Sequence, residues 1–174
     1  GSLGLLASII GVLAVRVKPG GHPGKALNNG TYLTTAIFAV LTLAATLLFQ
    51  FEIRLWLATF IGLLSGTVIG FSSELFTSDT GKPVARVAEA SQSGPAFTII
   101  TGFSYGLISS FPSILGIAIA AVASYKVAEP LGEGYALLGI SLAAIGMLSI
   151  VGMIISNDAY GPIVDNARGL AEMG

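Results

Sequence analysis

The C-terminal stretch of the chain carries the side chains best suited to chemistry. A long apolar run gives way there to three carboxylates, Asp158, Asp165 and Glu172. They stand seven residues apart, which is close to two turns of an α-helix. A helix over this stretch would therefore place all three on one face.

Carboxylates are hard oxygen ligands, and Mg²⁺ typically takes one or two of them and completes its shell with water and substrate phosphate. A solvated helix face shows the same spacing, so the spacing alone leaves both interpretations open. Gly161 and Pro162 lie between the first two acids and are expected to bend or open the helix. The chain has no GxxxxGK[ST] loop, no HExxH pair and no Ser/His/Asp set, so no second catalytic constellation competes.

The composition narrows the class of protein that presents these acids. The chain has 174 residues, of which 53% are hydrophobic and only 10% charged, with a net charge of −1. So few charges exclude a water-soluble domain, intrinsic disorder and a nucleic-acid binder. The absence of cysteine excludes a disulfide scaffold and a thiolate nucleophile, and a single histidine excludes a His-cluster zinc site.

Long stretches without charge predict the elements that position the acids. About 20 apolar residues cross a bilayer as a helix, and backbone groups in lipid must be paired within the segment. The fold class predicted is all-α, a polytopic transmembrane helix bundle forming one membrane region over 1–174. Its helices are predicted at 3–17, 31–50, 53–75, 94–125 and 134–160. The first is short and starts without Met, so it is expected to be a helix whose beginning is missing. A signal peptide is less favoured, because its basic residues would precede the apolar run, whereas Arg16 and Lys18 follow it.

The polar connections predict the orientation. Segments 18–30 and 76–93 are expected to be loops, the second with a short helix after Pro83. These loops and their flank hold five basic residues against two on the other side, which favours a cytoplasmic position for the loops and for the C-terminal end. The five are Arg16, Lys18, Lys25, Lys82 and Arg86, and the two are Arg54 and Lys126.

Small residues recur at helical spacing and predict close helix contacts. Gly62, Gly66 and Gly70 stand at four-residue intervals, and Gly102 and Gly106 repeat the interval in the next predicted span. Such patterns allow neighbouring helices to approach closely in membranes. We expect these five glycines to pack helices rather than to carry chemistry.

The C-terminal stretch resembles the ion-pumping membrane-bound inorganic pyrophosphatases. The family pattern is Asp-Ala-Tyr-Gly-Pro-x-x-Asp-Asn-Ala-Gly-Gly-x-Ala-Glu-Met, and the chain reads DAYGPIVDNARGLAEM from Asp158 to Met173. Residues 76–102, 25–32 and 135–149 are also similar to family segments. The resemblance covers essentially the whole chain.

The resemblance implies a larger protein. Family subunits have about sixteen membrane helices and form homodimers, so this chain would be an internal fragment with about five of them. They hydrolyse Mg-pyrophosphate and couple the reaction to H⁺ or Na⁺ transport. The implied cofactor is Mg²⁺, with K⁺ or Na⁺ as a candidate activator. The implied location is a multi-pass position in a cell inner membrane or an acidic organelle membrane, in contact with lipid.

The resemblance also assigns roles to residues. Asp158 matches the leading Asp of the motif and is expected to be catalytic and to hold Mg²⁺, and Asp165 is expected to be a further metal ligand. Asn166, Arg168 and Glu172 are expected at the substrate or directly behind it. Arg168 stands where the family has Gly, and a guanidinium beside a phosphate site is chemically reasonable. The fragment alone is expected to be inactive.

Two other functions remain open from the sequence. A secondary transporter would use Gly-rich helices around a substrate path, although no inverted repeat and no charge near the middle of a predicted span supports it. A purely structural helix scaffold would need no chemistry of its own. Mg²⁺-dependent pyrophosphate hydrolysis separates the pump from both.

Overall fold

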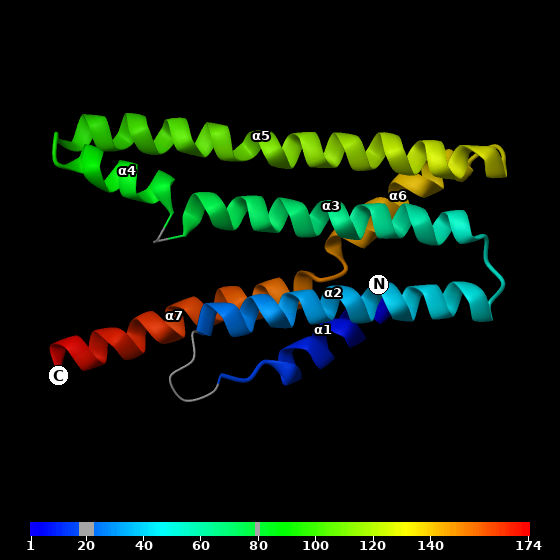
Figure 1. Ribbon diagram of the computed structural model, residues 1–174, viewed down its shortest axis with the longest axis horizontal. Coiled ribbons are helices and arrows are strands. Elements are labelled where there is room, and N and C mark those ends of the chain that lie inside the picture. The colour runs from blue at the N-terminus through cyan, green and yellow to red at the C-terminus, as the bar shows by residue number, and fades with distance from the viewer. Residues whose placement is uncertain (18–22, 79–80) are drawn as a thin grey trace. The chain divides into compact units, whose positions relative to one another are not determined.

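The computed structural model describes residues 1–17, 23–78 and 81–174, and these form helices joined by turns (Figure 1). No strand occurs in these ranges, so the predicted all-α class is confirmed. The helices are α1 (Ser2–Ala14), α2 (Pro23–Leu48), α3 (Ile53–Thr77), α4 (Lys82–Ser91), α5 (Pro95–Ala128), the short 3₁₀ helix η1 (Glu129–Leu131), α6 (Tyr135–Leu148) and α7 (Val151–Met173).

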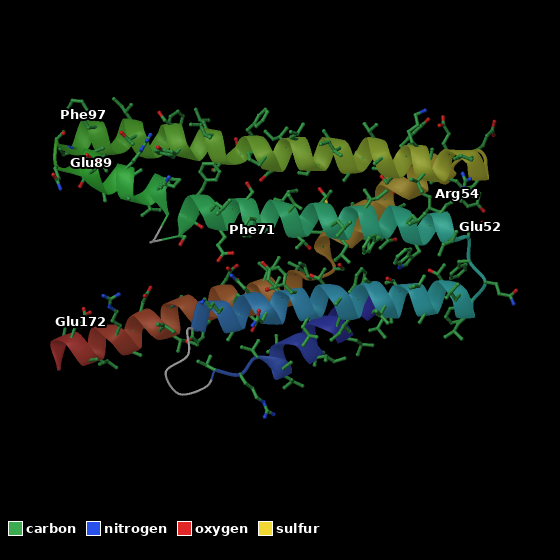
Figure 2. The ribbon with its side chains drawn as sticks, in the orientation of Figure 1. Glu52, Arg54, Phe71, Glu89, Phe97 and Glu172 are labelled. Carbon is green, nitrogen blue, oxygen red and sulfur yellow. The ribbon has the colours of Figure 1, made fainter. Side chains whose placement is uncertain are left out.

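Four helical stretches of the described chain are long and apolar enough to cross a membrane. Large apolar side chains point outward along them, as Phe71 and Phe97 do at 53% and 59% exposure (Figure 2). Water would not tolerate so much exposed apolar surface, whereas lipid or further helices would cover it. The four are Gly24–Leu48, Ile53–Ser91, Pro95–Leu131 and Tyr135–Met173, and the apolar helix Ser2–Ala14 is shorter.

Contacts divide the chain into two compact units. The terminal unit comprises Gly1–Trp56 and Leu148–Gly174, and the central unit comprises Leu57–Met147. In the terminal unit α1 packs against α2 and α7, and α2 also touches α7. The Trp56 indole N–H donates a hydrogen bond of 3.2 Å to the Ala39 carbonyl, which ties the first turn of α3 to α2.

In the central unit, glycines allow the backbones of α3 and α6 to approach each other closely. A methyl group added at Gly62 of α3 would collide with the Ala143 carbonyl of α6, and one added at Gly146 of α6 would collide with the Thr59 carbonyl of α3. The Ser65 hydroxyl of α3 donates to the Gly116 carbonyl of α5 at 2.8 Å. Polar groups and small residues therefore join these helices, as is usual where lipid removes the hydrophobic drive for association.

Helix α2 begins earlier than the predicted range 31–50. Residues 18–22 of the predicted loop 18–30 lie outside the described residues, but from Pro23 onward the chain is helical. Pro is well suited to a first helical position because its φ is already helical. Gly30 is buried, and a side chain there would collide with Val15 and Met153. Packing, rather than a turn, therefore accounts for this glycine.

Helix α2 ends in a left-handed residue. Gln50 has a φ of 54°, the Phe51 N–H donates to the Thr46 carbonyl at 2.9 Å, and the Gln50 N–H donates to the Leu47 carbonyl at 3.3 Å. These two bonds are the Schellman arrangement that satisfies the last carbonyls of a helix.

The polar segment predicted at 76–93 contains a helix of its own. Helix α4 spans Lys82–Ser91 and has Pro83 in its first turn, close to where the sequence placed a short helix. Residues 79–80 lie outside the described part of the chain. Helix α4 packs along α5.

The predicted helix 134–160 is two helices in the structure. Helix α6 ends at Leu148 and α7 begins at Val151, with Ile150 at φ −97° and ψ 8° between them. A methyl group at Gly4 of α1 would lie 2.7 Å from the Ser149 carbonyl oxygen, so α1 abuts the backbone at the break. The absence of charged residues over 134–157 predicts one continuous helix, and neither Gly nor Pro marks the break at 149–150.

Candidate functional site: the polar end of α7

Helix α7 changes character along its length. Its first turns are apolar, and Met153 is only 1% exposed within the terminal unit. From Asp158 to the end, every residue except Tyr160 and Gly169 is exposed. The first half of α7 is thus packed against other helices of the terminal unit, whereas its second half is exposed.

Asp158, Asp165 and Glu172 are all exposed on this second half, and Figure 2 shows Glu172 near the free end of α7. Because α7 is one helix, each seven-residue step separates neighbouring acids by about 10.5 Å along the axis. Mg²⁺ ligands lie about 2.0–2.1 Å from the ion, so these acids would serve different ions. No group of three His, Cys, Asp or Glu side chains gathers among the described residues.

The backbone carbonyl of Asp158 lies where the helical hydrogen-bond pattern is interrupted. Helix α7 continues through Gly161 and Pro162, where the sequence suggested a bend or a local opening. Pro162 stands four residues after Asp158 and has no N–H, so the Asp158 carbonyl lacks its ordinary helical donor. Beside its carboxylate, Asp158 thus has a backbone carbonyl without that donor.

Arg168 and Glu172 pair with each other. The Arg168 Nε lies 2.8 Å from a Glu172 carboxylate oxygen, and the two side chains are 75% and 63% exposed. An exposed pair of this spacing contributes about 0.3–0.5 kcal/mol, so it is readily exchanged for a bound anion. Asn166 is also exposed on this half of α7.

A hydrogen bond that the sequence did not predict lies one residue before Asp158. The Asn157 Nδ2 donates to the Thr31 Oγ1 of α2 at 3.2 Å. The two residues are 126 positions apart, so spacing offers no signal for the contact. The predicted site residues are thus carried on one helix, and this bond joins that helix to α2.

The five glycines predicted to pack helices occupy different environments. A methyl group at Gly62 would collide with Ala143, and one at Gly66 would lie 3.1 Å from backbone atoms of Met147. Gly70 and Gly106 face open space, and a methyl at Gly102 would touch Val87 at 4.0 Å. Of these five glycines, Gly62 and Gly66 therefore lie at a close contact between helices, that of α3 with α6.

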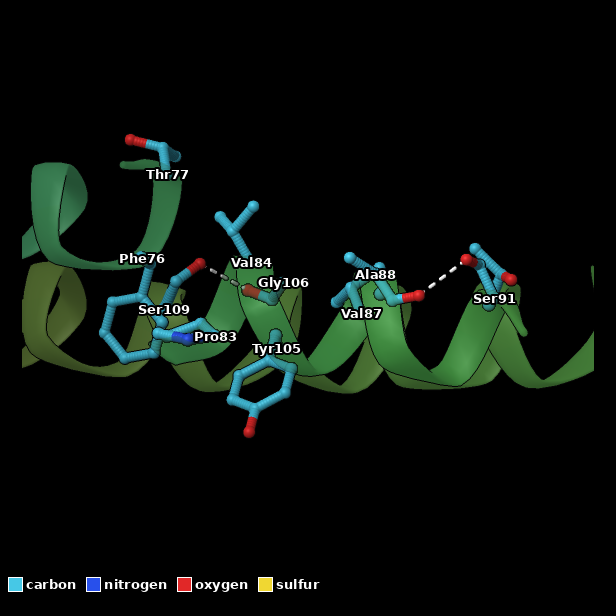
Figure 3. Close-up of a pocket in the computed structure, with 12 residues that line it drawn as sticks. Phe76, Thr77, Pro83, Val84, Val87, Ala88, Ser91, Tyr105, Gly106 and Ser109 are labelled. Carbon is cyan, nitrogen blue, oxygen red and sulfur yellow. Dashed lines mark hydrogen bonds between the residues drawn. The ribbon is translucent and has the colours of Figure 1, made fainter. Parts of the chain in front are cut away.

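A pocket of about 470 Å³ lies elsewhere, between α4 and α5 with the end of α3 (Figure 3). Its walls are mostly apolar, and none of the predicted chemical residues lines it. The lining residues are Phe76, Thr77, Pro83, Val84, Val87, Ala88, Ser91, Thr98, Gly102, Tyr105, Gly106 and Ser109. The pocket offers a surface for packing rather than for phosphate chemistry.

Comparison with known proteins decides the family. The sequence profile described as "Inorganic H+ pyrophosphatase" matches residues 1–174. The chain belongs to the inorganic H⁺ pyrophosphatase family. The resemblance expected from the Asp158–Met173 motif is thereby confirmed.

Pyrophosphate-energized pumps with different names are similar to this chain. A "Putative K(+)-stimulated pyrophosphate-energized sodium pump" of Clostridium tetani is 42% identical over 99% of the chain and 26% of the relative. A "K(+)-insensitive pyrophosphate-energized proton pump" of Methanosarcina mazei is 34% identical over 99% of the chain and 26% of the relative. A "K(+)-stimulated pyrophosphate-energized sodium pump" of Thermotoga maritima is 35% identical over 98% of the chain and 24% of the relative. The chain spans about a quarter of the length of these curated relatives.

Proposed function

We propose that this chain is the part of an ion-pumping membrane pyrophosphatase that supplies one metal- and substrate-bearing helix to the catalytic site. The complete protein hydrolyses Mg-pyrophosphate to phosphate and couples the reaction to H⁺ or Na⁺ transport. The observation that carries the proposal is the match of the pyrophosphatase family over all 174 residues, together with its motif on the exposed half of α7.

The donor set on α7 fits Mg²⁺ in the way expected of a partial site. Mg²⁺ keeps several waters and takes one or two carboxylates plus substrate phosphate oxygens. Asp158 and Asp165 are isolated carboxylates on an exposed face, so each provides one oxygen ligand and the remaining ligands come from other helices and from pyrophosphate. The metal, when bound, neutralises the charge of pyrophosphate and orients the attacking water.

Side chains beside the acids complete the proposed roles. Asn166 supplies an amide that donates to phosphate oxygens, and Arg168 exchanges Glu172 for phosphate when substrate arrives. Glu172 receives the guanidinium again once the products leave. The pair therefore keeps the cation available without leaving it unpaired between turnovers.

The proposal includes an orientation and an assembly. The polar segments and the end of α7 face the cytoplasm, where pyrophosphate is available, as the distribution of Lys and Arg indicates. The exposed apolar faces meet lipid and the remaining helices of the subunit, and two subunits form a homodimer. K⁺ or Na⁺ acts as an activator if the protein follows its K⁺-stimulated relatives.

The test uses the full reading frame expressed in sealed membrane vesicles. We expect phosphate release that requires both Mg²⁺ and pyrophosphate, accompanied by vesicle acidification or by uptake of radioactive Na⁺. A protonophore collapses the first signal and leaves Na⁺ uptake in place, which identifies the ion. Folded protein that releases no phosphate, or that releases it without moving either ion, would contradict the proposal.

A further inference from the structure

We propose that the hydrogen bond between Asn157 and Thr31 is a positioning device that fixes the rotation of α7 and so aims Asp158 at the metal and substrate. Thr31 is then a positioning residue contributed by α2, outside the Asp158–Met173 motif. The inference rests on the proposed function, because it gives the bond a role in that reaction.

The rotation of α7 about its own axis is not inherited from the preceding helix. The backbone leaves helical geometry at Ser149–Ile150, between α6 and α7. A continuous helix would transmit its angular register from turn to turn, at about 100° per residue, but a break does not. Contacts within the terminal unit must therefore set the direction in which Asp158 faces.

Those contacts differ in how strictly they fix an angle. Gly152 lies against Ser8 of α1, where an added methyl would be 2.9 Å from the Ser8 Cβ, and Met153 packs against Gly30 of α2. Apolar contacts of this kind hold helices together but tolerate small rotations. A hydrogen bond weakens steeply as its geometry departs from linearity, so the bond from Asn157 adds the angular constraint.

The polarity of the bond is also determined. The Thr31 hydroxyl donates its only proton to the Leu27 carbonyl at 3.2 Å, so its oxygen can only accept from a neighbour. Asn157 meets this need with an N–H at 3.2 Å. Asn157 thus donates to the Thr31 hydroxyl, and that hydroxyl donates to the Leu27 carbonyl. An acceptor at position 157 would break this series of hydrogen bonds.

The bond lies next to Asp158, so its loss would change the direction in which that carboxylate points. In the described structure no side-chain hydrogen bond links α7 to another helix beyond Asn157, and Asp158 is the next residue. A shift of about 1 Å at a reacting group can cost about 100-fold in rate. Losing the bond relaxes the angle without removing the carboxylate, so we expect a smaller cost.

The test compares Thr31→Val with a matched control in the full-length protein. Thr31→Val keeps the shape and removes the acceptor. Thr35→Val removes a hydroxyl that, among the described residues, donates to the Thr31 carbonyl of its own helix at 2.9 Å. We expect Thr31→Val to lower the rate of pyrophosphate hydrolysis about tenfold and to raise the Mg²⁺ concentration for half-maximal rate several-fold. Thr35→Val and Thr31→Ser should behave as wild type.

A double variant separates positioning from general support of the fold. If Thr31 acts through Asp158, then Thr31→Val should cost nothing further in an Asp158→Asn background, because interacting residues are not additive. An equal tenfold loss in both backgrounds would overturn the inference, as would a wild-type rate and Mg²⁺ dependence for Thr31→Val.

Asn157→Asp provides an independent route if Thr31→Val does not fold. It is nearly isosteric and replaces the N–H by an oxygen, so it should reproduce the loss of rate and the shift in Mg²⁺ dependence. A wild-type rate for folded Asn157→Asp would overturn the inference. Absence of hydrolysis in the wild type would overturn the proposed function together with this role, whereas an active wild type with unaffected variants would overturn the inference alone.

Discussion

Substitution of Asp158 by Asn in the full-length protein is expected to lower Mg²⁺-dependent pyrophosphate hydrolysis by about 100-fold or more, the usual cost of removing one group that stabilises a transition state. Asp158 is exposed on α7 and makes no ion pair in the described structure, so the nearly isosteric amide should leave the helix intact. The substitution removes only the charge that we propose to hold Mg²⁺. The measurement is steady-state phosphate release at saturating Mg²⁺ and pyrophosphate.

Glu133→Gln is the matched control for this prediction. Glu133 is another exposed acid, in the turn before α6 and far along the chain from the motif. It undergoes the same change of charge and should keep the wild-type rate. Equal rates for wild type and Asp158→Asn would remove Asp158 from the site, while equal losses in both variants would point to net charge instead.

Gly62→Ala is expected to destabilise the protein by about 1–3 kcal/mol, the range seen when atoms are forced into a packed interface. An added methyl would collide with the Ala143 backbone of α6, and a backbone atom cannot rotate away as a side chain can. The two helices must separate to admit it. The measurement is the temperature at which half of the detergent-solubilised protein remains monodisperse after heating. This temperature should be lower for Gly62→Ala than for the wild type.

Gly70→Ala makes the identical chemical change two turns farther along α3. A methyl at Gly70 meets nothing within 4 Å, so this variant should be as stable as wild type or slightly more stable, because Ala restricts the unfolded chain. Equal destabilisation of both variants would show that helix propensity, rather than the contact with α6, governs these positions.

These two glycines show what the sequence could predict about packing. The four-residue spacing of Gly62, Gly66 and Gly70 marks one helix face, but spacing does not say how far a neighbouring helix extends along that face. Contact with α6 covers the first two and leaves Gly70 open. Which part of a small-residue stripe is used depends on the length and direction of another helix, information that local sequence does not contain.

The helical class and the family could be predicted, because each depends on a continuous stretch of sequence: the charge-free runs for the class and the Asp158–Met173 motif for the family. Charge-free runs predicted an all-α membrane protein, and the α3 bounds differ from the predicted 53–75 by only two residues. The break at 149–150 could not be predicted, since the charge-free run continues through it and neither Gly nor Pro stands at those two positions. It arises where α1 meets the Ser149 backbone, a contact between distant parts of the chain.

The candidate site divides in the same way. The acids of α7 were found from their spacing and from the motif that contains Asp158, and both are local signals. Thr31 and Asn157 were missed because a single hydrogen bond between residues 126 positions apart leaves no periodic trace. Residues that we propose to bind the metal are thus easier to find from the sequence than residues that we propose to position them.

The central claim is that Asp158 holds a metal that neutralises pyrophosphate. The most direct measurement is an experimental structure of the full-length protein with Mg²⁺ and methylenediphosphonate, a pyrophosphate analogue that does not hydrolyse. The account predicts an Asp158 carboxylate oxygen about 2.0–2.1 Å from a Mg²⁺ that also contacts the analogue. A bound analogue whose metal ions all lie more than one water molecule away from Asp158 would contradict it.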